Sequence, residues 1–476
     1  MEEHFSEERY SLMLDSLFQR FPSFQKVGAG AYKPGIGNME FMDQLLGHPH
    51  SKYKVIHVAG TNGKGSVSNM MASSLASLGF KVGLYTSPHI LDFRERIRVI
   101  SGHEDTAGQT GVDGLCHCAR QSGISTLIPK EDVWNFIRKW EDTFDHLDMS
   151  FFEITTSMAL DWFAGQGVDY VVLETGLGGR LDSTNIVTPV LSVITNIGLD
   201  HCDLLGGTLP EIAFEKAGII KPRVPVVIGE SNSETDPVFE RKVLYTNLPE
   251  PKFMGSRTEI MSLLTFADKV APTMWDKHEE ILSRMDLQGA CQRHNLRTVL
   301  AALDVLEVPF DRACVADAIE RTAARTDFHG RWERIMEDPM VICDIGHNEH
   351  GLKLNMKRLS DMLAAGECGS LVIVYGIMSD KDFHSIAHLL PAEAHYVFTS
   401  APGPRALPAE ALAQKYVAYC AEKEIQCAQY QVEQDPSKAM KMALETASGM
   451  HEPLVYVGGS TYVVAEVMRS NSEELW

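Results

Sequence analysis

A short apolar run followed at once by a glycine-rich loop constrains this chain most. Residues 54–59 read KVIHVA, which predicts a buried β-strand, and residues 60–66 read GTNGKGS. Small and apolar residues at helical spacing then continue to Leu78, Gly79 ends that pattern, and residues 81–86 predict a second strand. A strand, a loop, a helix and a strand in this order indicate a βαβ unit, so we expect a parallel sheet.

The loop contains the residue types that a phosphate-binding loop needs. Its glycines would let backbone N–H groups approach an anion, Lys64 would meet the phosphate charge, and Ser66 would offer a hydroxyl to Mg²⁺. The alternative is a tight turn that carries an incidental lysine. In the general phosphate loop the hydroxyl residue directly follows the lysine, whereas here Gly65 intervenes. We predict that the whole segment binds ATP: Gly60, Thr61, Asn62, Gly63, Lys64, Gly65 and Ser66.

Composition limits the classes of protein and the compartment. The chain has 476 residues and a formal net charge of -21, which argues against a nucleic-acid-binding protein. The N-terminal sequence MEEHFSEERY is acidic and lacks the apolar run of a secretory signal, and no apolar stretch reaches the length of a membrane span. The nine cysteines lack paired spacing, and the C-x-C at residues 116–118 has no second half-site for zinc. We expect a cytoplasmic, monomeric protein.

Further apolar runs indicate two α/β domains. Strands are expected at residues 168–173, 190–195 and 224–228, and after a break at residue 328 they resume at 341–343, 371–375, 395–399 and 454–457. Helices are expected at 153–163, 209–218 and 295–305, whereas residues 101–127 are aperiodic and indicate a surface loop or insertion of open role. The predicted fold is a large P-loop-type domain with a mainly parallel sheet in residues 1–328 and a smaller Rossmann-like α/β domain in 329–476.

Several sequence blocks occur in a fixed order along most of the chain. GTNGKGS is preceded by HVA, and TSPH at 86–89, RERI at 94–97 and FE at 152–153 follow it. ETGLGGRLDSTN at 174–185, TNIGLDH at 195–201, EKAGIIK at 215–221, GR at 330–331 and DIGHN at 344–348 complete the set. Together they resemble the folylpolyglutamate synthase/dihydrofolate synthase family, a branch of the Mur-ligase-like ATP-dependent amide ligases.

This resemblance implies an activity and its site residues. The activity would be addition of L-glutamate to dihydropteroate, to the glutamate tail of tetrahydrofolates, or to both, through an acyl phosphate made from ATP, with two Mg²⁺ sites. The C-terminal domain would bind glutamate. Implied catalytic residues are Lys64, Lys216, Asp344 and His347; ATP contacts beyond the loop are Asn295, Arg331 and Asp344; metal ligands are Ser66, Ser87, Glu174 and His201; folate contacts are Phe152, Glu153, Gly179, Arg180 and Asp182. In this family the lysine at the position of Lys216 is carbamylated.

Several of these assignments have a structural alternative, and for His201 it is a structural histidine whose ring is hydrogen-bonded within the protein. Lys216 could be a surface lysine of the 209–218 helix, Asn295 could be a helix cap, and Phe152 could be a core residue. In the 344–349 block Gly346 and Glu349 stand where the family usually has alanine and proline, which we expect to loosen this loop.

Two other functions compete with the folate ligase. A Mur-type ligase would add an amino acid to a UDP-sugar peptide, but that branch usually has Thr or Ser directly after GTNGK and lacks the TSPH block. A nucleotide-gated module without enzymatic activity would not need the predicted metal and nucleotide residues together. The motifs do not separate dihydrofolate synthase from folylpolyglutamate synthase activity, and we favour a bifunctional enzyme.

Overall fold

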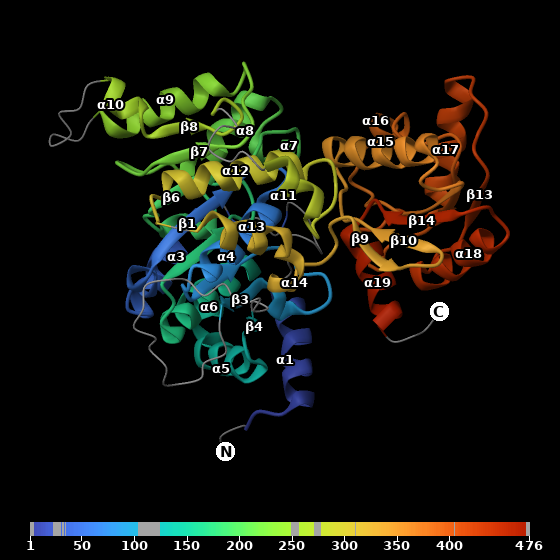
Figure 1. The fold of residues 1–476 in the computed structure, drawn as a ribbon. Helices are drawn as coiled ribbons and strands as arrows, with labels where there is room; N and C mark the ends of the chain where they lie inside the picture. The colour runs from blue at the N-terminus through green and yellow to red at the C-terminus, as the bar shows by residue number, and fades with distance from the viewer. Residues whose placement is uncertain are drawn as a thin grey trace. The chain divides into compact units, whose positions relative to one another are not determined.

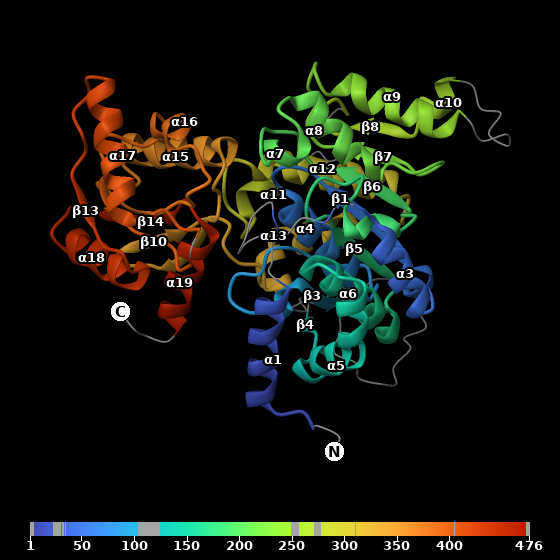
Figure 2. The same ribbon diagram turned by 180° about the vertical axis from the view of Figure 1, so that it is seen from behind.

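The computed structural model describes residues 4–21, 30, 33, 35–102, 124–248, 257–270, 278–309, 311–403 and 405–472. The chain divides into two compact units (Figures 1 and 2). Unit 1 comprises Met1–His89, Arg94–Asp286 and Gln292–Phe328. Unit 2 comprises His329–Trp476 together with the short segments Ile90–Phe93 and Leu287–Cys291. The tripeptide at 116–118 and most of the 101–127 segment lie outside the described residues.

Unit 1 is built on an 8-stranded sheet with the order β4-β3-β2-β5-β1-β6-β7-β8. β3 pairs antiparallel with β2 and with β4, and the other pairs are parallel. This arrangement confirms the predicted α/β class with a mainly parallel sheet. The strands are β1 (Lys54–Ala59), β2 (Val82–Tyr85), β3 (Ile97–Ser101), β4 (Ile124–Leu127), β5 (Tyr170–Glu174), β6 (Leu191–Ile194), β7 (Val226–Ile228) and β8 (Leu264–Phe266).

The helices of unit 1 cover both faces of this sheet. On one face α4 (Lys64–Ser77) packs against β1, β2, β3 and β5, and α12 (Gln292–Val305) packs against β6 and β7. The remaining helices are α1 (Glu7–Arg20), α3 (Gly37–Leu45), α5 (Lys130–His146), α6 (Phe151–Gln166), α7 (Cys202–Leu205), α8 (Leu209–Lys216), α9 (Asp236–Asn247), α10 (Arg257–Met261), α11 (His278–Arg284), α13 (Arg312–Glu320) and α14 (Thr322–Thr326), with 3₁₀ turns η2 (Pro49–Lys52), η3 (Phe93–Arg96), η4 (Ser183–Ile186) and η5 (Ala217–Ile219).

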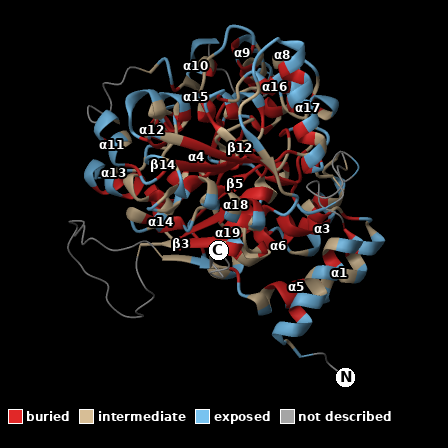
Figure 3. Cartoon of the chain, turned by 90° about the vertical axis from the view of Figure 1, so that its right-hand side faces the viewer, coloured by how far each residue is buried: buried red, intermediate tan, exposed pale blue. Residues whose placement is uncertain are grey.

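Burial and helix capping explain why these elements form. The side chains of β1 after its first residue are all buried, and α4 buries a stripe of small residues that lets it lie close to the sheet. α6 and α8 each begin with a capping box, in which Ser150 pairs with Glu153 and Thr208 with Glu211. Figure 3 shows the strands as buried and the outward faces of helices such as α1 and α5 as exposed.

Unit 2 contains a 6-stranded sheet with the order β13-β12-β11-β14-β10-β9. Its pairs are parallel except for β9 with β10, so it confirms the predicted smaller α/β fold. Its elements are β9 (Glu333–Met336), β10 (Met340–Cys343), α15 (Glu349–Ala365), β11 (Ser370–Tyr375), α16 (Phe383–Ala387), β12 (His395–Phe398), α17 (Ala409–Glu422), β13 (Tyr430–Val432), α18 (Pro436–Ser448), β14 (Pro453–Gly458) and α19 (Thr461–Ser472).

Sequence and structure differ at some sheet edges. Residues 124–127 were predicted as loop, but they form β4, which pairs with β3 through backbone hydrogen bonds. Short strands β9 and β13 were not predicted either. All three lie at a sheet edge, where pairing with one neighbour sets the conformation and the side chains need not alternate between apolar and polar.

Candidate active site

The glycine-rich loop lies at the carboxyl end of β1, between the ends of β5 and β6. Register pairs Val58 with Glu174 on β5 and Ala59 with Ile194 on β6, so the three strands end at the same edge of the sheet. The carboxyl edge of a parallel sheet is where open α/β folds bind ligands. Residues 60–63 of the loop then lead into α4, whose first turn has no side-chain cap. Its N–H groups are therefore suited to an anion.

Two glycines of the loop are required by close contacts. Gly60 has φ 152°, and a Cβ atom there would lie 1.9 Å from Oγ1 of Thr195. Gly63 has φ 82°, in the left-handed region, and a Cβ atom there would lie 2.2 Å from Oδ1 of Asn295. Both residues therefore keep the loop backbone close to neighbouring segments of unit 1.

The segment after β6 holds the loop in shape. The backbone N–H of Thr61 donates to the carbonyl of Asn196 at 3.0 Å, and the N–H of Asn62 donates to Oδ1 of Asn196 at 2.8 Å. The Thr195 hydroxyl donates to the Asn62 carbonyl at 2.5 Å. Sequence reasoning did not single out Thr195 and Asn196, although their place directly after an apolar run next to β1 was the available signal.

Two lysines meet at one carbonyl of the loop. Nζ of Lys64 donates to the Gly60 carbonyl at 3.0 Å, and Nζ of Lys216 donates to the same oxygen at 2.8 Å. Burial, and to a smaller extent the Lys64 charge, lower the pKa of Lys216 to about 7, while Asp200 and Asp182 oppose the shift. Lys216 is 4% exposed, so the alternative of a surface lysine is wrong.

Glu174 and Ser87 lie together beside the loop. Glu174 ends β5, is 2% exposed, and accepts a hydrogen bond from the Ser87 backbone N–H at 3.1 Å. Its Oε2 would lie 3.9 Å from a Cβ atom built on Gly65. The Ser66 hydroxyl accepts a hydrogen bond from Gln292 at 3.4 Å. A buried carboxylate and two serines therefore surround the start of α4.

His201 is positioned separately at the start of α7, with φ 52° and Nε2 3.9 Å from Oδ1 of Asp200. Within the described ranges, no three His, Cys, Asp or Glu side chains converge as a metal-binding group. This donor set fits Mg²⁺ better than zinc, because Mg²⁺ is usually held by one or two carboxylates together with water and substrate phosphates.

Asn295 contacts the loop from α12. It is the fourth residue of that helix, so the alternative of a helix N-cap is wrong, because the helix starts one turn earlier than the sequence indicated. Its Nδ2 donates to Oε1 of Gln292 at 2.9 Å, and its Oδ1 faces Gly63. Gln292, which sequence reasoning missed, thus links Asn295 to Ser66.

Two of the predicted folate residues present exposed surface. Phe152 is half-buried, lies against Gly176, and its ring centroid is 5.8 Å from that of Tyr85. Arg180 points outward and pairs with Glu215, its Nη2 lying 2.9 Å from Oε1. An aromatic ring is able to stack on a flat ring, and a guanidinium is able to pair with a carboxylate.

The other predicted folate residues are used within the protein. Glu153 accepts from the Ser150 N–H at 2.6 Å in the capping box. Asp182 is buried and accepts from the Leu177 N–H at 2.8 Å and the Thr184 N–H at 3.0 Å, and burial raises the pKa of this carboxyl. A Cβ atom on Gly179 would lie 2.8 Å from the Lys216 carbonyl. Asp182 and Gly179 therefore shape the 174–185 loop and its contact with α8, whereas Glu153 caps α6.

The predicted residues of unit 2 surround the turn after β10. Asp344 accepts hydrogen bonds from the N–H groups of Trp332 at 2.9 Å and Gly346 at 2.7 Å and from Nδ2 of Asn355 at 2.6 Å. A Cβ atom on Gly346 would lie 2.8 Å from Oδ1 of Asp344, so the glycine lets the backbone of this turn approach the carboxylate closely.

The two remaining predicted residues of unit 2 are partly exposed. Nδ1 of His347 lies 3.1 Å from the Ile345 carbonyl. Nε of Arg331 is buried and has no hydrogen-bond partner among the described residues. A buried N–H group without a partner costs free energy, which a ligand oxygen would offset.

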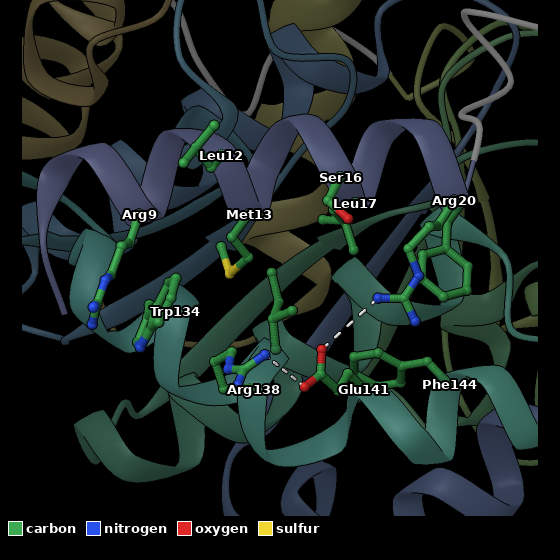
Figure 4. A pocket seen from close by; sticks show the side chains of 12 residues that line it. Arg9, Leu12, Met13, Ser16, Leu17, Arg20, Trp134, Arg138, Glu141 and Phe144 are labelled. Atoms are coloured by element: carbon green, nitrogen blue, oxygen red, sulfur yellow. Dashed lines mark hydrogen bonds and ion pairs between the residues drawn. The ribbon is translucent and has the colours of Figure 1, made fainter. Parts of the chain in front are cut away.

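A separate cavity of about 290 Å³ lies between α1 and α5 (Figure 4). Trp134 and Leu17 face it from the two helices, and Glu141 lies 2.8 Å from Arg138 and 3.8 Å from Arg20 at its edge. None of the predicted site residues lines it. Among the residues that the structure describes, no helix has the length and apolar character to cross a lipid bilayer.

A glycine-rich loop at the carboxyl edge of a mainly parallel sheet, together with a second α/β unit, is the arrangement expected of a Mur-type ligase. Residues 330–461 match the family described as "Mur ligase, glutamate ligase domain". The chain is 32% identical over 448 residues to the dihydrofolate synthase/folylpolyglutamate synthase of Bacillus subtilis, covering 92% of this chain and 95% of that protein. It is 31% identical over 376 residues to the folylpolyglutamate synthase of Lacticaseibacillus casei, covering 76% and 80%. The chain belongs to the dihydrofolate synthase/folylpolyglutamate synthase family.

Solved structures agree with this assignment. Folylpolyglutamate synthase of Thermotoga maritima aligns with a TM-score of 0.72 at 27% identity, covering 98% of this chain and 97% of that one. E. coli FolC in complex with DHPP and ADP aligns with a TM-score of 0.73 at 25% identity, covering 98% of both chains. The predictions of an ATP-dependent glutamate ligase and of its family are confirmed, and the Mur-type ligase for UDP-sugar peptides is not favoured.

Proposed function

We propose that this chain is a bifunctional enzyme that uses ATP to join L-glutamate to dihydropteroate and to the glutamate tail of tetrahydrofolates. The observation that carries the proposal is the junction of Lys64, Lys216 and the Gly60 carbonyl beside Glu174. The Bacillus subtilis relative carries both activities in its name, and the E. coli relative was solved with DHPP and ADP.

ATP would bind with its phosphates on the glycine-rich loop. The uncapped first turn of α4 offers N–H groups, and Lys64 adds a positive charge that can follow the transferred phosphoryl group. Asn295 lies against Gly63 and would contact the adenine. Arg331 of unit 2 has an unpaired Nε and suits a phosphate because its planar fork grips two oxygens. We assign Asp344 and His347 to the same nucleotide.

Two Mg²⁺ sites are proposed at Ser66, Ser87, Glu174 and His201. When bound, Mg²⁺ would neutralise charge on the phosphate oxygens. Support comes from Glu174, which is buried beside the loop, from the Ser66 hydroxyl in the first turn of α4, and from Ser87, whose backbone N–H donates to Glu174. His201 would complete the set from the end of the β6 segment.

Lys216 is proposed to be carbamylated. The reaction joins the neutral amine to CO₂, forms a nitrogen–carbon bond and releases one proton. A charged ammonium has no lone pair for this step, and the pKa of about 7 leaves a large neutral fraction at neutral pH. The carbamate would place a negative charge next to Gly60, where it can orient a metal ion.

The folate would lie against the 174–185 loop and the start of α6. Phe152 presents a half-buried ring for stacking, and Arg180 an exposed guanidinium for a carboxylate. Glu153, Gly179 and Asp182 keep their assignment to this site, and their contacts support a role in holding its shape. Unit 2 would bind the incoming L-glutamate.

The proposed reaction proceeds in two steps. The folate carboxylate attacks the γ-phosphorus of ATP, which gives an acyl phosphate and ADP. The neutral glutamate amine then attacks the acyl carbon, the new amide bond forms as the acyl–phosphate bond breaks, and phosphate leaves with the proton that the amine loses. Lys64 and the N–H groups of the loop stabilise charge on the transferred group in the first step.

A phosphate-release assay tests this proposal. The full chain is supplied with ATP, Mg²⁺ and L-glutamate, and then with dihydropteroate, tetrahydrofolate or a UDP-sugar peptide. We expect release with the first two acceptors. Release with tetrahydrofolate alone would overturn the bifunctional assignment, and release with none would overturn the ligase proposal.

A further inference from the structure

Three cationic side chains gather on one side of unit 1, in a chain whose net charge is -21. Arg180 lies in the loop after β5, Lys221 follows η5, and Lys242 lies on α9, which packs against α8. We refer to Arg180, Lys221 and Lys242 as the cationic cluster. None of the predicted functions above uses Lys221 or Lys242.

Hydrogen bonds tie two members of the cluster to one loop. Nδ2 of Asn185 donates to the Arg180 carbonyl at 3.1 Å and to the Gly218 carbonyl at 3.2 Å. The carbonyl of Asn185 accepts from Nζ of Lys221 at 3.0 Å. The 180–185 loop and the 218–221 segment are therefore locked together, with Lys221 held beside the loop that carries Arg180.

The third member is held nearby by α9. The backbone N–H of Arg223 donates to Oδ1 of Asn247 at 2.8 Å, which fixes the end of α9 to the same segment. The pKa shifts also indicate that the three cations lie near one another. Burial is the larger cause in each case, but Arg180 also lowers the pKa of Lys242, and Lys242 also lowers the pKa of Lys221.

The positive charge of this cluster is only partly neutralised. Arg180 is paired with Glu215. Neither Lys221 nor Lys242 lies within ion-pair distance of a carboxylate in the described part of the chain. Two half-buried ammonium groups that repel each other cost free energy, and a ligand with more than one negative charge would offset that cost.

The proposed substrate has such charges at regular intervals. Each γ-linked glutamate leaves one free α-carboxylate, so a folate tail carries one negative charge per residue behind its growing end. The growing end would lie at the phosphate loop. Gly179 lies against the Lys216 carbonyl, and Nζ of Lys216 reaches Gly60, so the loop that carries Arg180 begins close to that end.

We propose that Arg180, Lys221 and Lys242 bind the α-carboxylates of glutamate residues already attached to the folate. This inference rests on the proposed function. It makes the cluster a determinant of tail length, because a monoglutamate offers only one α-carboxylate to the three cations.

Lys242→Gln is the variant that tests the inference. Because a partly exposed ion pair is worth up to about 1 kcal/mol, we expect KM for a tetrahydrofolate triglutamate to rise about three- to fivefold relative to KM for the monoglutamate. Arg241→Gln is the matched control, since it removes the same charge from an exposed position of the same helix and should not change that ratio. Lys242→Arg should restore the ratio.

A binding measurement separates this inference from the proposed function. Calorimetry with a free γ-linked tetraglutamate and the full-length chain needs no catalysis. The inference is supported if the tetraglutamate binds more weakly to Lys242→Gln than to Arg241→Gln, and if the higher affinity of the wild type decreases at high salt. This result would support the cluster even if ligase activity is absent. Equal binding by the two variants overturns the inference, as does an unchanged KM ratio in an active enzyme.

Discussion

Replacing Lys216 with methionine is predicted to stabilise the fold while abolishing ligase activity. The pKa of this lysine falls from 10.5 to about 7 because the side chain is buried. Each tenfold change in a protonation equilibrium is worth 1.36 kcal/mol, so the charged form destabilises the folded state by about 5 kcal/mol. Methionine has a similar length and no charge, and its main cost is the hydrogen bond to Gly60, about 1 kcal/mol.

The sign of this effect depends on pH. The folded pKa lies below the unfolded pKa, so the penalty is complete below pH 7 and disappears as the pH rises from 7 to 10.5. The unfolding free energy of the wild type therefore rises with pH through this window. The unfolding free energy of the variant does not show this rise, because methionine does not titrate. The variant's advantage in unfolding free energy should shrink by about 3 kcal/mol between pH 6.5 and pH 9.5.

Urea unfolding in CO₂-free buffer measures this difference with the lysine unmodified. The exposed Lys52 provides the control, because Lys52→Met makes the same chemical change without relieving a buried charge. If Lys216→Met and the wild type keep a constant difference across this pH range, the charge of Lys216 does not oppose folding and the reasoning fails.

Three further predictions use other features of unit 1. Gly63→Ala should weaken ATP binding at least tenfold, measured by equilibrium dialysis. The left-handed backbone costs an alanine about 1–2 kcal/mol, and the new methyl group would clash with Asn295. Gly79→Ala is the control, because it has the same backbone strain but open space around it, and it should leave ATP binding unchanged. Arg98→Met should lower the unfolding free energy by about 3 kcal/mol in urea, since four oxygen acceptors lose a buried donor. Removal of CO₂ should reduce kcat, and added bicarbonate should restore it. The restored kcat should increase as the pH rises through 7, because Lys216 becomes neutral there. A kcat that does not respond to bicarbonate would contradict carbamylation.

Opposite demands on Lys216 explain why a buried amine is retained next to Lys64. A buried charge weakens the fold, but a neutral amine at neutral pH is what carbamylation requires. A hydrophobic residue would be the more stable choice at this position, so we propose that Lys216 serves the reaction and that the core of unit 1 offsets its free-energy cost. Asp344 differs, because three donors within unit 2 satisfy its carboxylate.

The sequence by itself determined the phosphate loop, the central strands and the family. The structure of residues 54–66 is determined by their own sequence, because an apolar run specifies a buried strand and the glycines permit the positive-φ conformations of the loop that follows it. The same holds for the strands that end at Glu174 and before Thr195. Ordered blocks along the chain identified the ligase, since several motifs in one order are far more specific than one loop.

Only the tertiary structure decided what the individual side chains contact. Burial and pairing depend on residues far apart in the sequence: Lys216 meets Gly60 across 156 positions, and Asn295 meets Gly63 from another helix. Strand β4 exists because β3 offers an edge, not because its own residues alternate. The lowered pKa values of Lys216, Lys221 and Lys242 follow from burial and from neighbouring cations that packing supplies, and no local sequence pattern indicates them.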